Sequence, residues 1–467
     1  MPFTRQALAE GLHATRSWGL EGAPLDGVFT DTRAKVPGGL FFALSGPNHD
    51  AHDYLNQALE SGASGLVVSR EEKLPSDLPN DTFVAVVPDT RRALGRLGSM
   101  VRAHLDGPVV AVTGSVGKTT VKDMAVAALK AFGTCGRSPG NWNNDIGVPL
   151  SLFALEGSER HVVLELGMSA PGEIAELTEM VQPNVGLVTT AAAAHLEFFD
   201  SVDAIADAKA ELYGALPAQA MAVACADDPR ILERAKRMAG DRLITYGLHE
   251  DADVRVVEIR LSAEGLATVI ELEGQTVTVQ LRALGRHNAV NAAGALAIVH
   301  ALGHDVAVGA RALAKGFSSS AHRLTLLESP SGARVLDDCY NANPKSTAAA
   351  LRTLEEIAPG APRAAVIGSM LELGPTSATL HREIGALAAS TGVTWLGATG
   401  PFAKDIVAGA IEAGLTSAVA VDDAMELRDE LKITVSSEHW LLLKGSRGQR
   451  LERLLPILDL DERGGSA

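Results

Sequence analysis

Residues 113–120, which read TGSVGKTT, constrain the fold more than any other part of the sequence. They follow a short apolar run at 108–112 and precede a helical pattern that begins at Lys118. In that helix, apolar side chains recur at positions 121, 124, 125, 128, 129 and 132 and form one stripe. A buried strand, a glycine turn and an amphipathic helix in this order indicate a phosphate-binding loop of a parallel sheet.

The chemistry of this loop suits an anionic ligand. Glycines let the backbone N–H groups turn toward phosphate oxygens, the helix N-terminus adds partial positive charge, and a threonine hydroxyl can ligate Mg²⁺. The spacing GxxGKTT departs from the usual GxxxxGK[ST], because Val112 stands at the first glycine position. A plain glycine-rich turn with a surface lysine is the alternative. The expected phosphate contacts are Gly114, Ser115, Val116, Gly117, Lys118, Thr119 and Thr120.

Two residues after neighbouring apolar runs are candidates to bind the metal of a nucleotide. Glu165 ends the run HVVLE, and His195 follows the next predicted strand in AAAAHLE. Ligands gather at the carboxyl ends of parallel strands, so both residues would lie near the loop. A solvated loop glutamate and a capping histidine are the alternatives. Lys209, in DAKAELY, is on spacing alone a lysine on a helix face, with Glu211 nearby.

The composition excludes several classes of partner. The formal charge of −16 repels nucleic acids and anionic lipids, and only 4% of residues are aromatic, which disfavours base stacking. No apolar stretch reaches the roughly 18 residues of a membrane span, and three separated cysteines suit a reducing compartment. We therefore expect a cytoplasmic protein with no nucleic-acid or membrane partner.

The alternation of short apolar runs with helical stretches along the chain predicts an α/β fold with three domains. We expect a small α/β domain at 1–104, a central P-loop domain with a parallel sheet at 105–317, and a Rossmann-like domain at 318–467. Alternating apolar residues at 252–282 predict antiparallel strands within the central domain, followed by a helix at 287–302.

Ten motifs together, in this order along the chain, resemble the Mur ligases, the ATP-dependent amide ligases of peptidoglycan synthesis. The motifs are TDTRAKVPGGLFFALSG (30–46) with HDAHDY (49–54), the phosphate loop, GNWNNDIGVPL (140–150), LELGM (164–168), AHLEFF (194–199), DAKAELY (207–213), GRHNAVNAAGA (285–295), DDCYNANP (337–344), GSMLELG (368–374) with HREIG (381–385), and LKGSRG (443–448). The resemblance covers essentially the whole chain.

The resemblance implies a reaction. DDCYNANP and MLELG with HREIG look most like the branch that adds D-alanyl-D-alanine to UDP-N-acetylmuramoyl tripeptide. In this family, ATP phosphorylates a carboxylate to an acyl phosphate, which the amine then attacks to give the amide, ADP and phosphate. ATP and Mg²⁺ are therefore implied, with a monomer expected. A sister ligase that adds the third stem residue and a folylpolyglutamate synthase-like ligase are the alternatives.

The resemblance also implies roles for particular residues. The catalytic set would be Lys118, Glu165, His195 and Lys209. Thr119 and Glu165 would hold one Mg²⁺. His195 would hold a second Mg²⁺, which Lys209 would support if CO₂ carbamylates it. Asn288, Arg323 and Asp338 would contact ATP. The substrate contacts would be Thr30, Asp31, Thr32, Arg33, Asn143, Asn144, Asn341, Lys444 and Arg447.

Some positions depart from the family pattern. Val116 stands where Asn is common, Ala residues precede His195 where Asn and Gly are frequent, and Ser369 stands where Asp is frequent. His322 precedes Arg323 where Gly is usual. In the N-terminal region, Ser45 and Ala51 replace a customary Lys and Gly. None of these changes removes a principal charge of the implied catalytic set.

Overall fold

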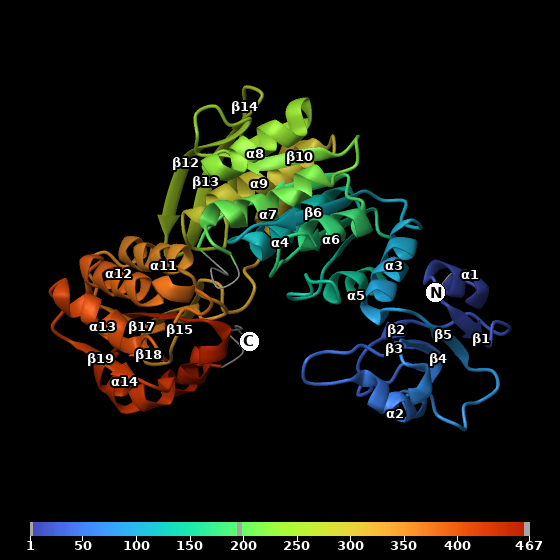
Figure 1. The fold of residues 1–467 in the computed structure, drawn as a ribbon. Coiled ribbons are helices and arrows are strands. Elements are labelled where there is room, and N and C mark those ends of the chain that lie inside the picture. The colour runs from blue at the N-terminus through green and yellow to red at the C-terminus, as the bar shows by residue number, and fades with distance from the viewer. Residues whose placement is uncertain (1–2, 194–198, 462–467) are drawn as a thin grey trace. The chain divides into compact units, whose positions relative to one another are not determined.

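The computed structural model describes residues 3–193 and 199–461, and within them the chain is an α/β protein with three sheets (Figure 1). The chain divides into two compact units. One comprises Met1–Ala111, Gly133–Asn184 and Ala215–Ala220, and the other Val112–Phe132, Val185–Gly214 and Met221–Ala467. The α/β fold class predicted from the sequence is confirmed, whereas the domain boundaries near 104 and 317 stay a prediction.

The N-terminal sheet has the strand order β1-β5-β4-β3-β2, parallel except for β1. Its strands are β1 (Arg16–Trp18), β2 (Val28–Phe29), β3 (Gly39–Phe42), β4 (Ala63–Val68) and β5 (Phe83–Val86), with helices α1 (Arg5–Gly11), α2 (Leu55–Glu60) and α3 (Thr90–Arg102). Asp89 caps α3 by accepting hydrogen bonds from the N–H groups of Arg91 and Arg92. The α3 helix packs against α5 (Gly147–Phe153) and α6 (Glu173–Val181), so it belongs to the packed structure of its unit.

A nine-stranded sheet has the order β14-β13-β12-β11-β10-β9-β6-β8-β7. Its strands are β6 (Val109–Thr113), β7 (Cys135–Arg137), β8 (His161–Glu165), β9 (Val185–Val188), β10 (Met221–Cys225), β11 (Leu243–Gly247), β12 (Val254–Ser262), β13 (Gly265–Leu272) and β14 (Gln275–Leu281). Helices α4 (Lys118–Leu129), α7 (Val202–Gly214), α8 (Pro229–Ala239), α9 (His287–Ala301) and α10 (Val306–Gly316) accompany it. The predicted antiparallel strands are confirmed as the β12-β13-β14 meander.

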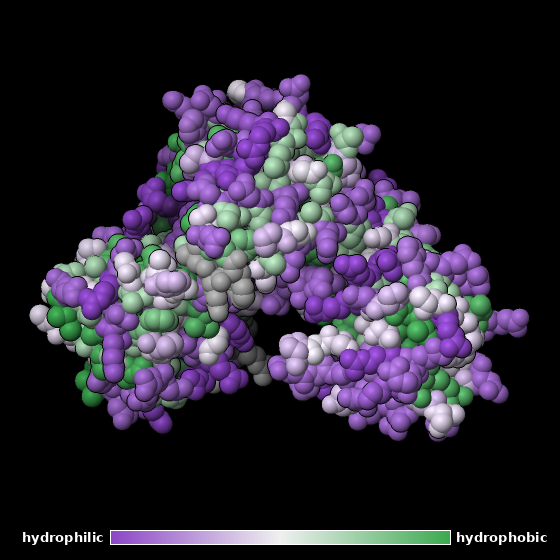
Figure 2. All heavy atoms as spheres, in the orientation of Figure 1, coloured by the Kyte–Doolittle hydropathy of each residue, from purple (hydrophilic) through white to green (hydrophobic). Residues whose placement is uncertain are grey.

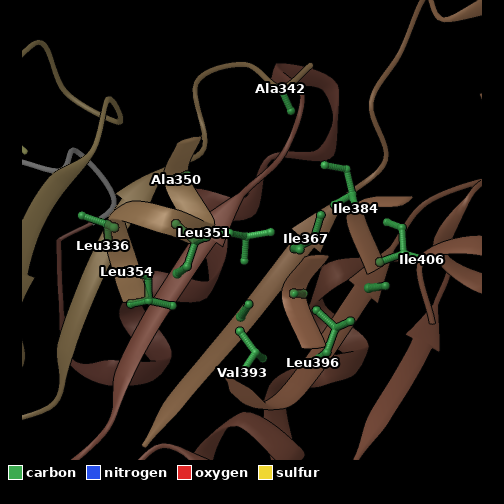
Figure 3. Packing of buried hydrophobic residues seen from close by; sticks show 14 of the residues in the cluster. Leu336, Ala342, Ala350, Leu351, Leu354, Ile367, Ile384, Val393, Leu396 and Ile406 are labelled. Atoms are coloured by element: carbon green, nitrogen blue, oxygen red, sulfur yellow. The ribbon is translucent and has the colours of Figure 1, made fainter. Parts of the chain in front are cut away.

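The C-terminal sheet has the order β15-β16-β20-β17-β18-β19 and is parallel except for β15. Its strands are β15 (Thr325–Glu328), β16 (Arg334–Asp338), β17 (Arg363–Gly368), β18 (Val393–Thr399), β19 (Ala418–Val421) and β20 (Trp440–Lys444), and its helices are α11 (Pro344–Ile357), α12 (Ser377–Ser390), α13 (Ala403–Glu412) and α14 (Arg428–Thr434). Aliphatic side chains from the strands and from α11, α12 and α13 form a buried core (Figure 3).

Polar side chains cover most of the face shown in Figure 2, as the negative charge of the chain leads one to expect. Among the residues that the structure describes, no helix has the length and apolar character needed to cross a membrane.

Two glycines allow α12 and α13 to pack with their backbones in contact. A Cβ on Gly385 would lie 1.9 Å from the carbonyl oxygen of Ile406, and one on Gly409 would lie 2.0 Å from that of Arg382. We expect Gly385→Ala to destabilise this region by about 1–3 kcal/mol, because the helices must move apart.

Gly95→Ala in α3 is the matched control, since nothing lies within 4 Å of a Cβ there. It should stabilise the protein by about 0.5–1 kcal/mol, because alanine loses less backbone entropy in a helix. Calorimetric unfolding of both variants measures the two shifts, and shifts of the same sign would contradict this account of the helix contact.

Candidate active site

Hydrogen bonds from the segment after β9 hold the phosphate loop in shape. Thr189 Oγ1 donates to the Val116 carbonyl at 2.7 Å, and the Ser115 N–H donates to the Thr190 carbonyl at 2.7 Å. Ser115 Oγ accepts from the Ala192 N–H at 3.0 Å. The loop is therefore fixed by its neighbours before any ligand arrives.

Two glycines give this loop its turn. Gly114 has a φ of 140°, and a Cβ there would lie 1.8 Å from Thr189 Oγ1, so no larger residue fits. Gly117 has a φ of 89° and forms the N-cap of α4. Lys118 begins α4, and its Nζ donates to the Gly114 carbonyl at 2.8 Å. The predicted strand, turn and helix are confirmed.

The hydroxyl groups around the loop fit an oxyanion. Among the described residues, the buried Oγ1 atoms of Thr113 and Thr190 have no hydrogen-bond partner. Thr119 and Thr120 add two further hydroxyls in the first turn of α4. Unpaired buried hydroxyls beside a helix N-terminus and a lysine are typical of a site that binds phosphate oxygens.

Arg323 connects the C-terminal region to this loop. Its Nη2 donates to Thr119 Oγ1 at 3.1 Å, and its guanidinium carbon lies 4.3 Å from the centre of the Tyr340 ring. The stacking fixes the guanidinium plane. Of the residues predicted to contact ATP, Arg323 is thus placed beside the phosphate loop.

Asp338, the last residue of β16, forms a buried ion pair with Lys444 at 2.8 Å. Lys444 Nζ also donates to the Asn341 carbonyl at 2.6 Å. Burial raises the pKa of the Asp338 carboxyl, and the charges of Lys444 and Arg323 oppose that rise. Lys444 is only 2% exposed, so in this structure it organises the loop after β16, and its contact with substrate stays a prediction.

Asn288 and His287 open α9. The amide of buried Asn288 donates to the Leu284 carbonyl at 2.7 Å and accepts from Asn291 at 2.9 Å. Burial and the nearby charge of Lys444 lower the pKa of the His287 ring to about 4. The side chain of Asn288 is therefore held in place, and its contact with adenine stays a prediction.

Glu165 ends β8 as a carboxylate that is 2% exposed. Asn143 Nδ2 donates to Glu165 Oε1 at 2.9 Å, and the Ser138 hydroxyl accepts from the Glu165 N–H at 3.0 Å. Asn144 instead accepts from the N–H of Gly147, near the start of α5. A solvated loop position for Glu165 is wrong, and its buried, oriented carboxylate fits a metal ligand.

Lys209 lies on α7 and is 2% exposed, so a solvated lysine on a helix face is excluded. Its burial is compatible with the carbamylated, metal-supporting role that the resemblance implies, and that role stays a prediction. His195, the other candidate for the second metal, lies outside the described residues.

The N-terminal motifs are polar and ordered. In 30–33, Arg33 donates to both carboxylate oxygens of Asp31, and these bonds lower the pKa of that carboxyl to about 2. Thr32 Oγ1 donates to Gln57 at 3.3 Å, and Thr30 is half-buried.

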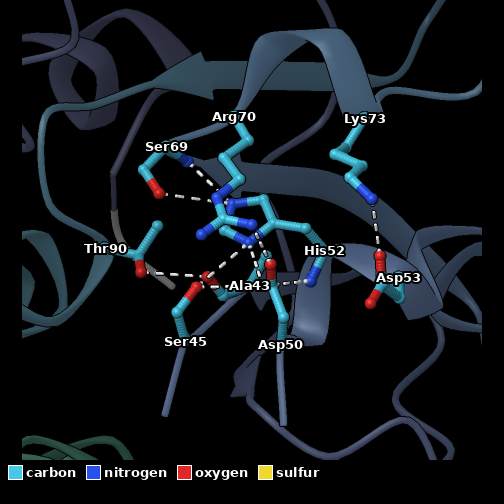
Figure 4. Close-up of polar contacts among 9 residues, drawn as sticks. All are labelled: Ala43, Ser45, Asp50, His52, Asp53, Ser69, Arg70, Lys73 and Thr90. Atoms are coloured by element: carbon cyan, nitrogen blue, oxygen red, sulfur yellow. Dashed lines mark hydrogen bonds and ion pairs between the residues drawn. The ribbon is translucent and has the colours of Figure 1, made fainter. Parts of the chain in front are cut away.

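A second cluster lies in 43–73 and is drawn in Figure 4. Asp50 accepts from Ser45, from Arg70 and from Nδ1 of the buried His52 ring. Burial alone would raise the pKa of Asp50, but the bonds from His52 and Ser45 lower it to about 2. His52 Nε2 accepts from the Ser69 N–H at 2.9 Å, so the ring ties two loops together.

Sequence reasoning missed three residues that support the loop. Thr189 binds the Val116 carbonyl, Asp228 Oδ2 accepts from the Ala191 N–H at 2.8 Å, and Tyr340 stacks on Arg323. Polar residues just after an apolar strand, in VTT and ADD, are the signal that could have found the first two.

Known proteins resemble this chain along its length. The Mur ligase middle domain matches residues 112–299, and the Mur ligase, glutamate ligase domain matches residues 322–447. A UDP-N-acetylmuramoyl-tripeptide–D-alanyl-D-alanine ligase of Escherichia coli is 36% identical over 94% of this chain and 95% of its own length. A MurF structure from Acinetobacter baumannii has a TM-score of 0.88 at 30% identity, over 98% of this chain and 99% of its own. A structure of the MurF ligase of Thermotoga maritima in complex with ADP has a TM-score of 0.82 at 27% identity, over 93% of this chain and 97% of its own.

Other ligases share the fold alone. A ligase for 2,6-diaminopimelate is 18% identical and a folylpolyglutamate synthase of Mycobacterium tuberculosis is 17% identical, with TM-scores of 0.54 and 0.60. They cover 91% and 76% of this chain, respectively.

The part-buried His287 ring predicts a pH-dependent stability. Its folded pKa of about 4 lies below the ordinary value of 6.5, so between these values the unfolded chain binds a proton that the folded chain does not. The free energy of unfolding should therefore fall as pH drops from 6.5 to 4, by roughly 3 kcal/mol from this group.

His287→Gln should remove that component, measured as the difference in unfolding free energy from the parent protein at each pH. His249→Gln serves as the control, because the His249 side chain is 50% exposed. A His287→Gln profile parallel to that of the parent would exclude a neutral His287 as the cause.

Proposed function

The chain belongs to the Mur ligase family, and we propose that it is the member that adds D-alanyl-D-alanine to UDP-N-acetylmuramoyl tripeptide, with ATP giving ADP and phosphate. The relative named for this reaction matches 94% of the chain. The observation that carries the proposal is the bond from Arg323 to Thr119, because it brings a cation of the glutamate-ligase domain match to the phosphate loop.

The reaction requires the carbonyl carbon of a carboxylate to become open to attack by an amine. A carboxylate oxygen of the tripeptide attacks the γ-phosphorus of ATP, ADP leaves, and an acyl phosphate forms. The amine of D-alanyl-D-alanine then attacks the acyl carbon, loses a proton, and displaces phosphate. Both steps bring anions together, so fixed cations and N–H donors lower the barrier. Lys118, the loop N–H groups and Arg323 are proposed to supply them.

Mg²⁺ is proposed to bind Thr119 and Glu165 at one position and His195 at another. When bound, it neutralises phosphate charge and polarises the phosphoryl oxygens. The buried carboxylate of Glu165, oriented by Asn143, supports the first position. Carbamylation of Lys209 would join its Nζ to the carbon of CO₂, with loss of a proton, and give an anionic ligand for the second.

The remaining contacts are those that the family resemblance implies. Asn288 and Asp338 are proposed to contact ATP, and the substrates are proposed to meet residues 30–33, Asn143, Asn144, Asn341, Lys444 and Arg447. Three widely separated cysteines suit a reducing compartment, and we propose the cytoplasm as that compartment. We propose a monomer as the working form. We propose no nucleic-acid or membrane partner.

A product assay tests this function. With ATP, Mg²⁺ and UDP-N-acetylmuramoyl tripeptide, phosphate release should require D-alanyl-D-alanine, and mass spectrometry should find the UDP-pentapeptide. Lys118→Ala should lower the rate at least about 100-fold through lost phosphate stabilisation. Lys130→Ala, at an exposed position after α4, should leave it unchanged. Release with glutamate or a diamino acid in place of the dipeptide would favour one of the alternative ligases.

Lys209→Ala tests the role of the buried lysine. The variant should lose at least about tenfold in rate, since a metal-supporting group is absent, and millimolar acetate or propionate should restore part of it. Lys236→Ala, exposed on α8, is the control. Full activity of Lys209→Ala without added acid would refute the carbamylated ligand.

A further inference from the structure

Three ligating side chains meet beside Arg323 and Asp338, outside the proposed catalytic set. They are His322 before β15, Asp337 on β16 and Cys339 just after it, and their ligand atoms all lie within 4.8 Å of one another. His322 Nδ1 lies 2.7 Å from Asp337 Oδ2 and 3.6 Å from Cys339 Sγ. Cys339 Sγ donates to Asp337 Oδ1 at 2.9 Å.

A fourth candidate ligand lies next to the thiol. Glu452, in the 3₁₀ helix Leu451–Leu458, places Oε2 3.9 Å from Cys339 Sγ. Its other oxygen, Oε1, accepts from Arg447 at 3.0 Å, so one oxygen faces the cluster while the second is bound to a cation. The cluster of three side chains therefore has one further carboxylate next to its thiol.

These separations suit a tetrahedral transition-metal ion. Bond lengths of about 2.0–2.3 Å at tetrahedral angles place ligand atoms about 3.4–3.6 Å apart. The distance of 3.6 Å from Nδ1 to Sγ already matches, and the two short contacts to Asp337 need to open by less than about 1 Å. The side chains of His322 and Glu452 are 12% and 13% exposed, which leaves an ion access to a cluster whose Asp337 is fully buried.

The backbone of His322 has an uncommon conformation. Its φ is 61°, in the left-handed region that glycine occupies without strain. A histidine at such a position adds one thing that glycine lacks, a ring nitrogen aimed at Asp337 and Cys339.

We propose that His322, Asp337, Cys339 and Glu452 form a binding site for a zinc-like divalent ion, distinct from the Mg²⁺ positions of the ligase reaction. A thiolate and an imidazole select Zn²⁺ or Co²⁺ over Mg²⁺, which takes oxygen ligands. On binding, the Cys339 thiol proton passes to solvent, and the ion replaces the hydrogen bonds that now converge on Asp337.

The site is tied to the loop that carries Arg323. The Tyr340 N–H donates to the His322 carbonyl at 3.2 Å, and the Leu324 N–H donates to Asp338 at 3.2 Å. An ion held by His322 and Cys339 would therefore crosslink the two segments that carry Arg323 and Asp338. Binding should raise the thermal midpoint of the intact protein, as any ligand of the folded state does.

Cobalt titration of the full-length, tag-free protein tests the site. In excess Mg²⁺, Co²⁺ should bind at one ion per chain with a thiolate-to-cobalt charge-transfer band, and one equivalent of Zn²⁺ should abolish the band. Absence of that band at saturating Co²⁺, or a band that Zn²⁺ does not displace, would overturn the proposal and leave a metal-free hydrogen-bonded network.

Variants assign the ligands. Cys339→Ser should lose the band, and His322→Asn should weaken Co²⁺ binding at least about tenfold. Asparagine tolerates positive φ and can still donate to Asp337, so this variant keeps the fold testable if the serine variant does not fold. A protein with both Cys135→Ser and Cys225→Ser should keep the band. Loss of the band only in that double variant would assign the thiolate elsewhere and refute the site.

Discussion

The exclusion of any side chain at Gly114 is the constraint on which the proposed active site depends. Thr189 Oγ1 occupies the space that a Cβ would take, and the same hydroxyl holds the Val116 carbonyl. The loop is therefore locked by a contact that works only with glycine. That lock sets where α4 begins and hence where the Thr119 hydroxyl meets Arg323.

The buried ion pair between Lys444 and Asp338 organises the C-terminal part of the proposed site. Lys444 and Asp338 are both buried, and a buried pair is stable only when each charge keeps its partner. Burial and, to a smaller extent, the positive charge of Lys444 also lower the pKa of the His287 ring at the start of α9. Lys444 thus acts on two segments predicted to contact ATP, although it was expected from the sequence to meet substrate.

Local sequence patterns predicted the helices and strands well, but they did not predict contacts between residues far apart in the sequence. The strand, glycine turn and helix around Lys118 are adjacent in sequence, so spacing alone identified them. The Arg323–Thr119 bond joins residues 204 positions apart, and no periodicity encodes it. Burial of Lys209 was equally hidden, because spacing reports the helix face of a residue and not what packs over that face. Glu452 approaches Cys339 across 113 positions and was missed for the same reason.

The partners of the two C-terminal cations separate a ligand-binding role from a structural one. Arg323 contacts a hydroxyl and an aromatic ring, which are neutral and can be exchanged for phosphate oxygens with little loss. Lys444 contacts a buried carboxylate, and moving it to a ligand would leave Asp338 charged without its partner. In a chain with a net charge of −16, an anionic nucleotide needs such exchangeable cations; Arg323 is one, whereas Lys444 can meet a substrate only by weakening its pair with Asp338.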